Sequence, residues 1–170
     1  MRFGILRDRI RASTSAEIED RLALAGPRLP TTLLQGVQLA IDELSSVRDW
    51  RTAIVIVSDS PTRSSGHTQN EAAAVTASTD ALIYALAPIE SNEPLLGWLA
   101  NQTGGAHVVL GGISDAAEET IRIGIGLRTL YVLGFESTVA NQDRRYRQLA
   151  VELRAPRGVG SLASRHRAGY

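Results

Sequence analysis

Apolar residues along the chain form short blocks that predict buried strands, and helical patterns separate these blocks. Ala53–Val57 is an unbroken apolar run rich in β-branched residues, which is typical of a strand buried on both faces. Two similar runs predict further strands over Ala81–Ala87 and Ala106–Leu110. Helical spacing and capping residues predict intervening helices that start after Thr31-Thr32 and over residues 69–77, 93–101 and 114–128.

This alternation predicts an α/β fold with an open, doubly wound, mostly parallel sheet. A fourth strand is predicted over Tyr131–Phe135. Beyond it, Leu149, Val151 and Leu153 alternate with polar residues, and a turn at 156–160 leads to a second strand over 161–166. We therefore expect an α/β domain over residues 1–135 and a C-terminal antiparallel hairpin in residues 136–170, packed on the same domain.

Composition narrows the class of partner. The 170 residues include 18 basic and 18 acidic residues, for a formal charge of +0, which argues against a general binder of nucleic acid or anionic membranes. No apolar run approaches the roughly 20 residues of a membrane span, and the first 15 residues do not resemble a signal peptide. As written, the chain is expected to be cytoplasmic. The segment 144–167 is rich in arginine and is either a solvated strand face or a surface for an acidic partner.

Asp59 is the main candidate for site chemistry, because it follows the Ala53–Val57 strand directly. Ligands of open parallel sheets bind at the carboxyl ends of the strands. Thr31 and Thr32 begin the helix that leads into this strand, and Ser58 and Ser60 flank Asp59. Threonine hydroxyls and carboxylates are oxygen ligands that suit Mg²⁺ or Ca²⁺. Spacing alone leaves two interpretations open, a metal or ligand site and an ordinary solvated loop.

Other motifs give no catalytic set. The glycine pair of "IGIGLRT" lies inside a predicted helix and not after a strand, so a dinucleotide-binding fingerprint is not indicated. The three histidines lack the spacing of metal ligands, there is no cysteine, and no G-x-S-x-G nucleophile elbow occurs. We therefore expect a protein that is not an enzyme.

Four segments, taken in order, resemble the bacterial VWFA-related subgroup of von Willebrand factor type A (VWA) domains. They are "PTTLLQGVQLAIDEL", "RTAIVIVSDS", "LIYALAP" with "LLGWLANQTGGAHVVL", and "LRTLYVLGFEST" with "DRRYRQLAVELRAPRG" and the terminal "RAGY". The resemblance implies a protein-interaction module whose metal-ion-dependent adhesion site (MIDAS) is completed by a carboxylate of the partner. It also implies that Thr32 and Asp59 are metal ligands, with Ser60 where the family usually has glycine.

The resemblance lacks one part of that site. The family's first strand ends in Asp-x-Ser-x-Ser, which supplies further oxygen ligands, and this motif is absent from the chain. We therefore expect an incomplete MIDAS that binds Mg²⁺ or Ca²⁺ weakly, and an unidentified protein partner. Loss of that strand would also leave the 51–58 strand with an open edge. We expect Arg2–Leu6 to shift inward and pair with this strand, and a homodimer through the exposed edge as a secondary tendency.

Two alternatives remain. One is a small-ligand or phosphate-binding α/β domain, either a binding protein or an enzyme, with phosphate at the helix N-termini near Thr32 and Ser60. The other is a true start upstream of Met1, which would restore the missing strand and make the protein periplasmic or secreted.

Overall fold

A computed structural model describes residues 33–45, 52–58, 69–88, 94–112, 114–135, 146–160 and 162–170. Four helices and three strands alternate in this part of the chain. They are α2 (Leu33–Leu44), β1 (Ala53–Val57), α3 (Gln69–Ala77), β2 (Leu82–Pro88), α4 (Pro94–Thr103), β3 (His107–Leu110) and α5 (Asp115–Arg128). The strands and helices predicted between residues 33 and 128 are confirmed, with ends shifted by at most two residues. The short strands expected over Arg2–Leu6 and Arg9–Ala12 and the helix expected from Ser15 to Ala25 lie outside the described residues.

The three strands form one parallel sheet in the order β1-β2-β3. Ile54 of β1 pairs with Ile83 of β2, and Ala85 of β2 pairs with His107 of β3. The inner residues of β2 are all buried, whereas those of β1 alternate between buried and half-buried. An unbroken apolar sequence suits a central strand covered on both faces. The expected open α/β sheet is therefore confirmed.

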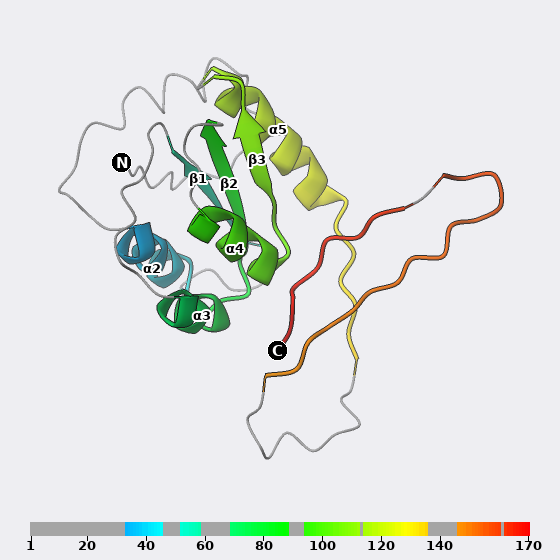
Figure 1. The fold of residues 1–170 in the computed structure, drawn as a ribbon, viewed down its shortest axis with the longest axis horizontal. Helices are drawn as coiled ribbons and strands as arrows, with labels where there is room; N and C mark the ends of the chain where they lie inside the picture. The colour runs from blue at the N-terminus through cyan, green and yellow to red at the C-terminus, as the bar shows by residue number, and fades with distance from the viewer. Residues whose placement is uncertain are drawn as a thin grey trace.

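Helices cover both faces of the sheet (Figure 1). The strand order β1-β2-β3 does not reverse within the described residues, so the predicted doubly wound topology is not shown there. On one face, α2, α3 and α4 pack against the sheet in a core that includes Leu33, Leu96 and Leu99. On the other face, α5 contributes Ala116 and Ile123 to a second, smaller core. Each fully buried Leu or Ile side chain stabilises the fold by roughly 1.5–3 kcal/mol.

The turn between α4 and β3 explains the Thr-Gly-Gly sequence at residues 103–105. The Ile83 amide of β2 donates a hydrogen bond of 2.9 Å to the Thr103 hydroxyl, which ties the end of α4 to the central strand. Gly104 ends the helix with φ of +83°, a conformation that glycine adopts without steric cost. A Cβ on Gly105 would lie 1.9 Å from the Ile83 carbonyl oxygen. Each of the three positions thus has its own packing requirement.

The predicted fourth strand, Tyr131–Phe135, is not formed. Residues 131–135 have no regular secondary structure, and the exposed fractions of Tyr131, Val132 and Leu133 are 92%, 75% and 73%. A strand needs a neighbour to satisfy its backbone groups, and an apolar sequence does not specify where that neighbour lies. The segment therefore leaves α5 as an exposed apolar stretch (Figure 1).

The C-terminal antiparallel hairpin is also not shown as regular strands in the described residues of this region. One antiparallel bridge joins Gln148 to Gly169, and hydrogen bonds pair Arg147 with Tyr170 and Leu149 with Ala168. Beyond this pairing the two segments extend away from the sheet (Figure 1). Leu149 and Val151 are half-buried, but 46% of Leu153 is exposed. The alternating pattern lacks a core along its far half, which is the physical reason that the predicted apolar face is not buried there.

The last residues of the chain nevertheless contact the α/β core. The Arg167 guanidinium donates hydrogen bonds to the carbonyl oxygens of Thr76 (3.0 Å) and Thr79 (2.9 Å), at and just beyond the end of α3. The Ala168 amide donates a hydrogen bond of 3.2 Å to the Gln102 carbonyl oxygen in α4. Residues 166–168 therefore lie against the ends of two helices of one layer.

Candidate functional site

The carboxyl edge of the sheet is where the sequence predicts a site. β1 ends at Val57, and the next residue, Ser58, is 1% exposed. The Ser58 amide donates a hydrogen bond of 2.9 Å to the Leu86 carbonyl oxygen of β2. The chain is thus fixed to the central strand up to the residue before Asp59. In open parallel sheets, the loops that bind ligands begin at this position, directly after the end of a strand.

The other predicted site residues, Thr31, Thr32, Asp59 and Ser60, lie outside the described residues. α2 begins at Leu33, the residue that follows Thr32 in the sequence. Ser58 is the one predicted site residue that the structure describes. Among the described residues, no group of three or more His, Cys, Asp or Glu side chains comes together as a metal site.

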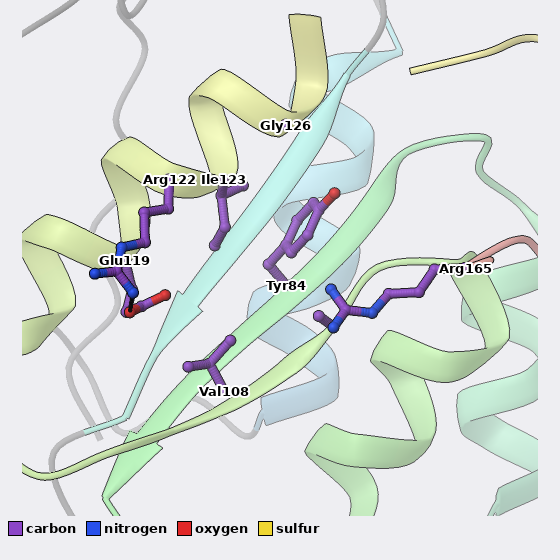
Figure 2. A pocket seen from close by; sticks show the side chains of 8 residues that line it. Tyr84, Val108, Glu119, Arg122, Ile123, Gly126 and Arg165 are labelled. Carbon is purple, nitrogen blue, oxygen red and sulfur yellow. Dashed lines mark hydrogen bonds and ion pairs between the residues drawn. The ribbon is translucent and has the colours of Figure 1, made fainter. Parts of the chain in front are cut away.

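A second feature is a cavity of about 180 Å³ between α5 and the sheet. Tyr84 from β2, Arg165 from the C-terminal segment and the pair Glu119 and Arg122 from α5 line it (Figure 2). Ala106, Val108, Ile123 and Gly126 form the remaining wall. Tyr84 lies near the start of β2 and Ala106 precedes β3, so the cavity is toward the amino ends of these strands, away from Ser58.

Of the two arginines that line this cavity, one is paired with a carboxylate and the other, among the described residues, is not. Arg122 and Glu119 are 2.8 Å apart and form an ion pair across one turn of α5. Arg165 makes no hydrogen bond or ion pair within the described part of the chain. Tyr84 is 9% exposed, and burial raises the pKa of its phenol, while the positive charge of Arg165 opposes that increase in pKa. The cavity therefore combines an apolar wall, a buried phenol and an uncompensated guanidinium.

Sequence reasoning did not identify Tyr84 or Arg165 as site residues. Tyr84 is the only residue with a polar tip in the apolar run "ALIYALA", which is the available signal. Arg165 belongs to the arginine-rich segment, for which a surface toward an acidic partner was one of two interpretations. Only the fold brings the two together, because 81 positions (165 − 84) separate them along the chain.

The glycine pair Gly124 and Gly126 lies within α5, as the predicted helix over 114–128 required. None of the described helices is both long and apolar enough to cross a membrane. No protein-family profile, curated protein or solved structure matches the chain.

Proposed function

We propose that the chain is a non-enzymatic protein-interaction module of the VWA type with an incomplete MIDAS. The observation that supports this proposal is the end of β1. A buried parallel strand stops at Val57, and Ser58 is held on β2 directly before Asp59. In open parallel sheets, residues in this position contact ligands. The order of the four sequence segments that resemble the family gives the proposal its VWA character.

The proposed site would hold a divalent cation only weakly. Mg²⁺ and Ca²⁺ take about six or more oxygen ligands, and Thr32 and Asp59 would supply two of them. Thr31, Ser58 and Ser60 lie beside them in the sequence and would contribute to contacts with a partner. A carboxylate from that partner would complete the metal shell, so metal and partner would bind together more tightly than either alone.

Disulfide trapping tests the geometry of this site, because the chain contains no cysteine. We expect the double variant Thr32→Cys, Asp59→Cys to form a disulfide under mild oxidation, since disulfides require Cα atoms within about 7 Å. The control is Asp59→Cys, Asp80→Cys, because Asp80 precedes β2 at the opposite edge of the sheet. A disulfide in the control and not in the test pair would overturn the proposed site.

Photo-crosslinking tests the interaction itself. A photoreactive amino acid at position 60, in cells that produce the protein, is expected to yield a discrete adduct with a second protein. The same group at Leu39, an exposed position on α2, is the control. We expect Asp59→Ala to reduce the adduct at position 60. Equal labelling at both positions, or none at position 60, contradicts an interaction at this edge.

The alternative, a small-ligand or phosphate-binding α/β domain that acts as a binding protein or an enzyme, is supported by the same open sheet. Separate calorimetric titrations with Mg²⁺, inorganic phosphate and ATP distinguish the two functions. The interaction module predicts no micromolar binding of any of the three. Micromolar binding of phosphate or ATP would favour the alternative, and micromolar binding of Mg²⁺ alone would overturn the incomplete site.

The C-terminal hairpin and the homodimer remain part of the proposal. The bridge at Gln148 and Gly169 supports antiparallel pairing of the two C-terminal segments. Within the described residues β1 pairs with β2 alone, and this open edge supports the proposed homodimer.

A further inference from the structure

We propose that the cavity between α5 and the sheet binds a carboxylate carried on a small apolar group, with Arg165 and Tyr84 as its polar contacts. This site is separate from the carboxyl edge, because its lining residues lie toward the amino ends of β2 and β3. The inference therefore does not depend on the proposed interaction module or on a metal.

The first argument concerns the Tyr84 hydroxyl. The side chain is 9% exposed, and within the described residues the hydroxyl makes no hydrogen bond. A buried hydroxyl without a partner costs free energy, because it has lost its hydrogen bonds with water, so buried polar groups are normally paired with protein or an ordered molecule. Tyr84 lines the cavity, and its ring lies between α5 and the Arg165 side chain (Figure 2). A ligand in the cavity that accepts a hydrogen bond would relieve this cost.

The second argument concerns charge. Three charged side chains line the cavity, and Arg122 is shared between the carboxylates of Glu119 (2.8 Å) and Glu118 (2.6 Å), so it is not free to bind an anion. Arg165 is left with no partner among the described residues, so its guanidinium is the lining cation that no described carboxylate offsets. Guanidinium groups bind carboxylates through two parallel hydrogen bonds. The arrangement therefore favours a ligand with one negative charge.

The third argument concerns size and shape. About 180 Å³ is smaller than the roughly 300–1,000 Å³ of typical small-molecule pockets, so a large cofactor does not fit. An engineered apolar cavity of about 150 Å³ in another protein holds benzene. The Val108 and Ile123 side chains provide an apolar wall for such a group. A ring-sized or branched aliphatic monocarboxylate matches both the volume and the charge.

This chemistry could come from a free organic acid or from the C-terminal carboxylate of a peptide with an apolar last residue. The test uses benzoate for the first source and a short peptide ending in leucine for the second, each measured by isothermal titration calorimetry. Benzamide and the same peptide with an amidated C-terminus are the neutral controls. We expect at least one carboxylate to bind and its neutral analogue to bind about 10-fold more weakly or worse.

Variants locate the binding. Arg165→Gln is expected to lower the affinity about 10-fold or more, and Tyr84→Phe to lower it by a smaller factor. Arg157→Gln is the matched control, because Arg157 is an exposed arginine of the same C-terminal segment and does not line the cavity. Thermal melts of each variant verify that the fold is retained. A second readout is the pKa of Tyr84, followed by the ultraviolet absorbance of tyrosinate. Bound benzoate should raise this pKa in the native chain and equally in the Arg157→Gln variant.

Three results would overturn the proposal. The first is that neither carboxylate binds at millimolar concentration. The second is that benzamide binds as well as benzoate, which would indicate an apolar cavity without anion selectivity. The third is binding that Arg165→Gln leaves unchanged in a folded variant. Because none of these measurements involves Thr32 or Asp59, their failure leaves the disulfide and crosslinking tests of the carboxyl edge unaffected.

Discussion

The Arg167 guanidinium lies 2.9 Å from the Asp80 carboxylate, although 87 positions separate the two residues along the chain. Asp80 is fully exposed, and exposed ion pairs contribute little to stability. The same guanidinium also donates to the carbonyl oxygens of Thr76 and Thr79. These groups lie at and just beyond the end of α3, which has no basic residue in its own last turn. Arg167 thus supplies from the C-terminus the cation that caps this helix.

We therefore predict that Arg167 stabilises the fold through the helix end and not through the ion pair. Arg167→Ala should lower the free energy of unfolding by about 1–2 kcal/mol, because two backbone acceptors lose a charged donor. Asp80→Ala should leave the unfolding free energy nearly unchanged. Urea denaturation of both variants measures the difference. Equal destabilisation by the two substitutions would contradict this account.

The Thr-Gly-Gly turn carries a second prediction. Gly105→Ala should destabilise the fold by about 3 kcal/mol, because the new Cβ would overlap the Ile83 carbonyl oxygen of the central strand. Gly124→Ala in α5 is the matched control, since no atom lies within 4 Å of its added Cβ. This control should stabilise the protein by about 0.5–1 kcal/mol through helix propensity. Thermal melts that rank the two variants in the opposite order would refute the packing argument.

The sequence was sufficient to predict the α/β core, because the apolar runs at 53–57 and 82–88 are long enough and uniform enough to indicate strands covered on both faces. It failed at Tyr131–Phe135 and beyond Gln148, where local patterns are strand-like but no core covers them. Periodicity reports which side chains could be buried together, and the neighbouring element decides whether they are. The cavity could not be predicted at all, since Tyr84 and Arg165 meet only through the docking of the C-terminal segment on the helix ends.

Stability at high pH should depend on Tyr84. Burial raises the pKa of this phenol above the ordinary tyrosine value of 10.0, so the folded state holds the proton more tightly than the unfolded chain. The resulting stabilisation is fully present below pH 10.0 and is lost as the pH rises through the folded-state pKa. Urea denaturation on both sides of this pH measures the loss. All 18 basic residues are arginine, so lysine does not titrate in the same range.

Tyr84→Phe is the control for this pH dependence, and its unfolding free energy should fall less steeply above pH 10.0. Arg165→Gln should steepen the dependence, because the guanidinium lowers the pKa that burial raises. Identical pH profiles for the native chain and Tyr84→Phe would show that the exposed tyrosines, and not the buried one, govern the effect.

The exposed apolar stretch at 131–133 predicts concentration-dependent self-association. Within the described residues β3 pairs with β2 alone, and 56% of its Val109 side chain is exposed. An open strand edge and an exposed apolar segment are each surfaces through which chains associate. We expect sedimentation velocity to show a mass above 18.3 kDa that rises with concentration.

Replacing Tyr131, Val132 and Leu133 together by serine should return the chain to a monomer, because the substitution removes the apolar surface that the contact would bury. The matched control replaces Leu39 and Ile125, exposed apolar residues on α2 and α5, and should associate like the native chain. Association that persists in the triple variant, or a native chain that stays at 18.3 kDa throughout, would mean that this segment does not mediate pairing.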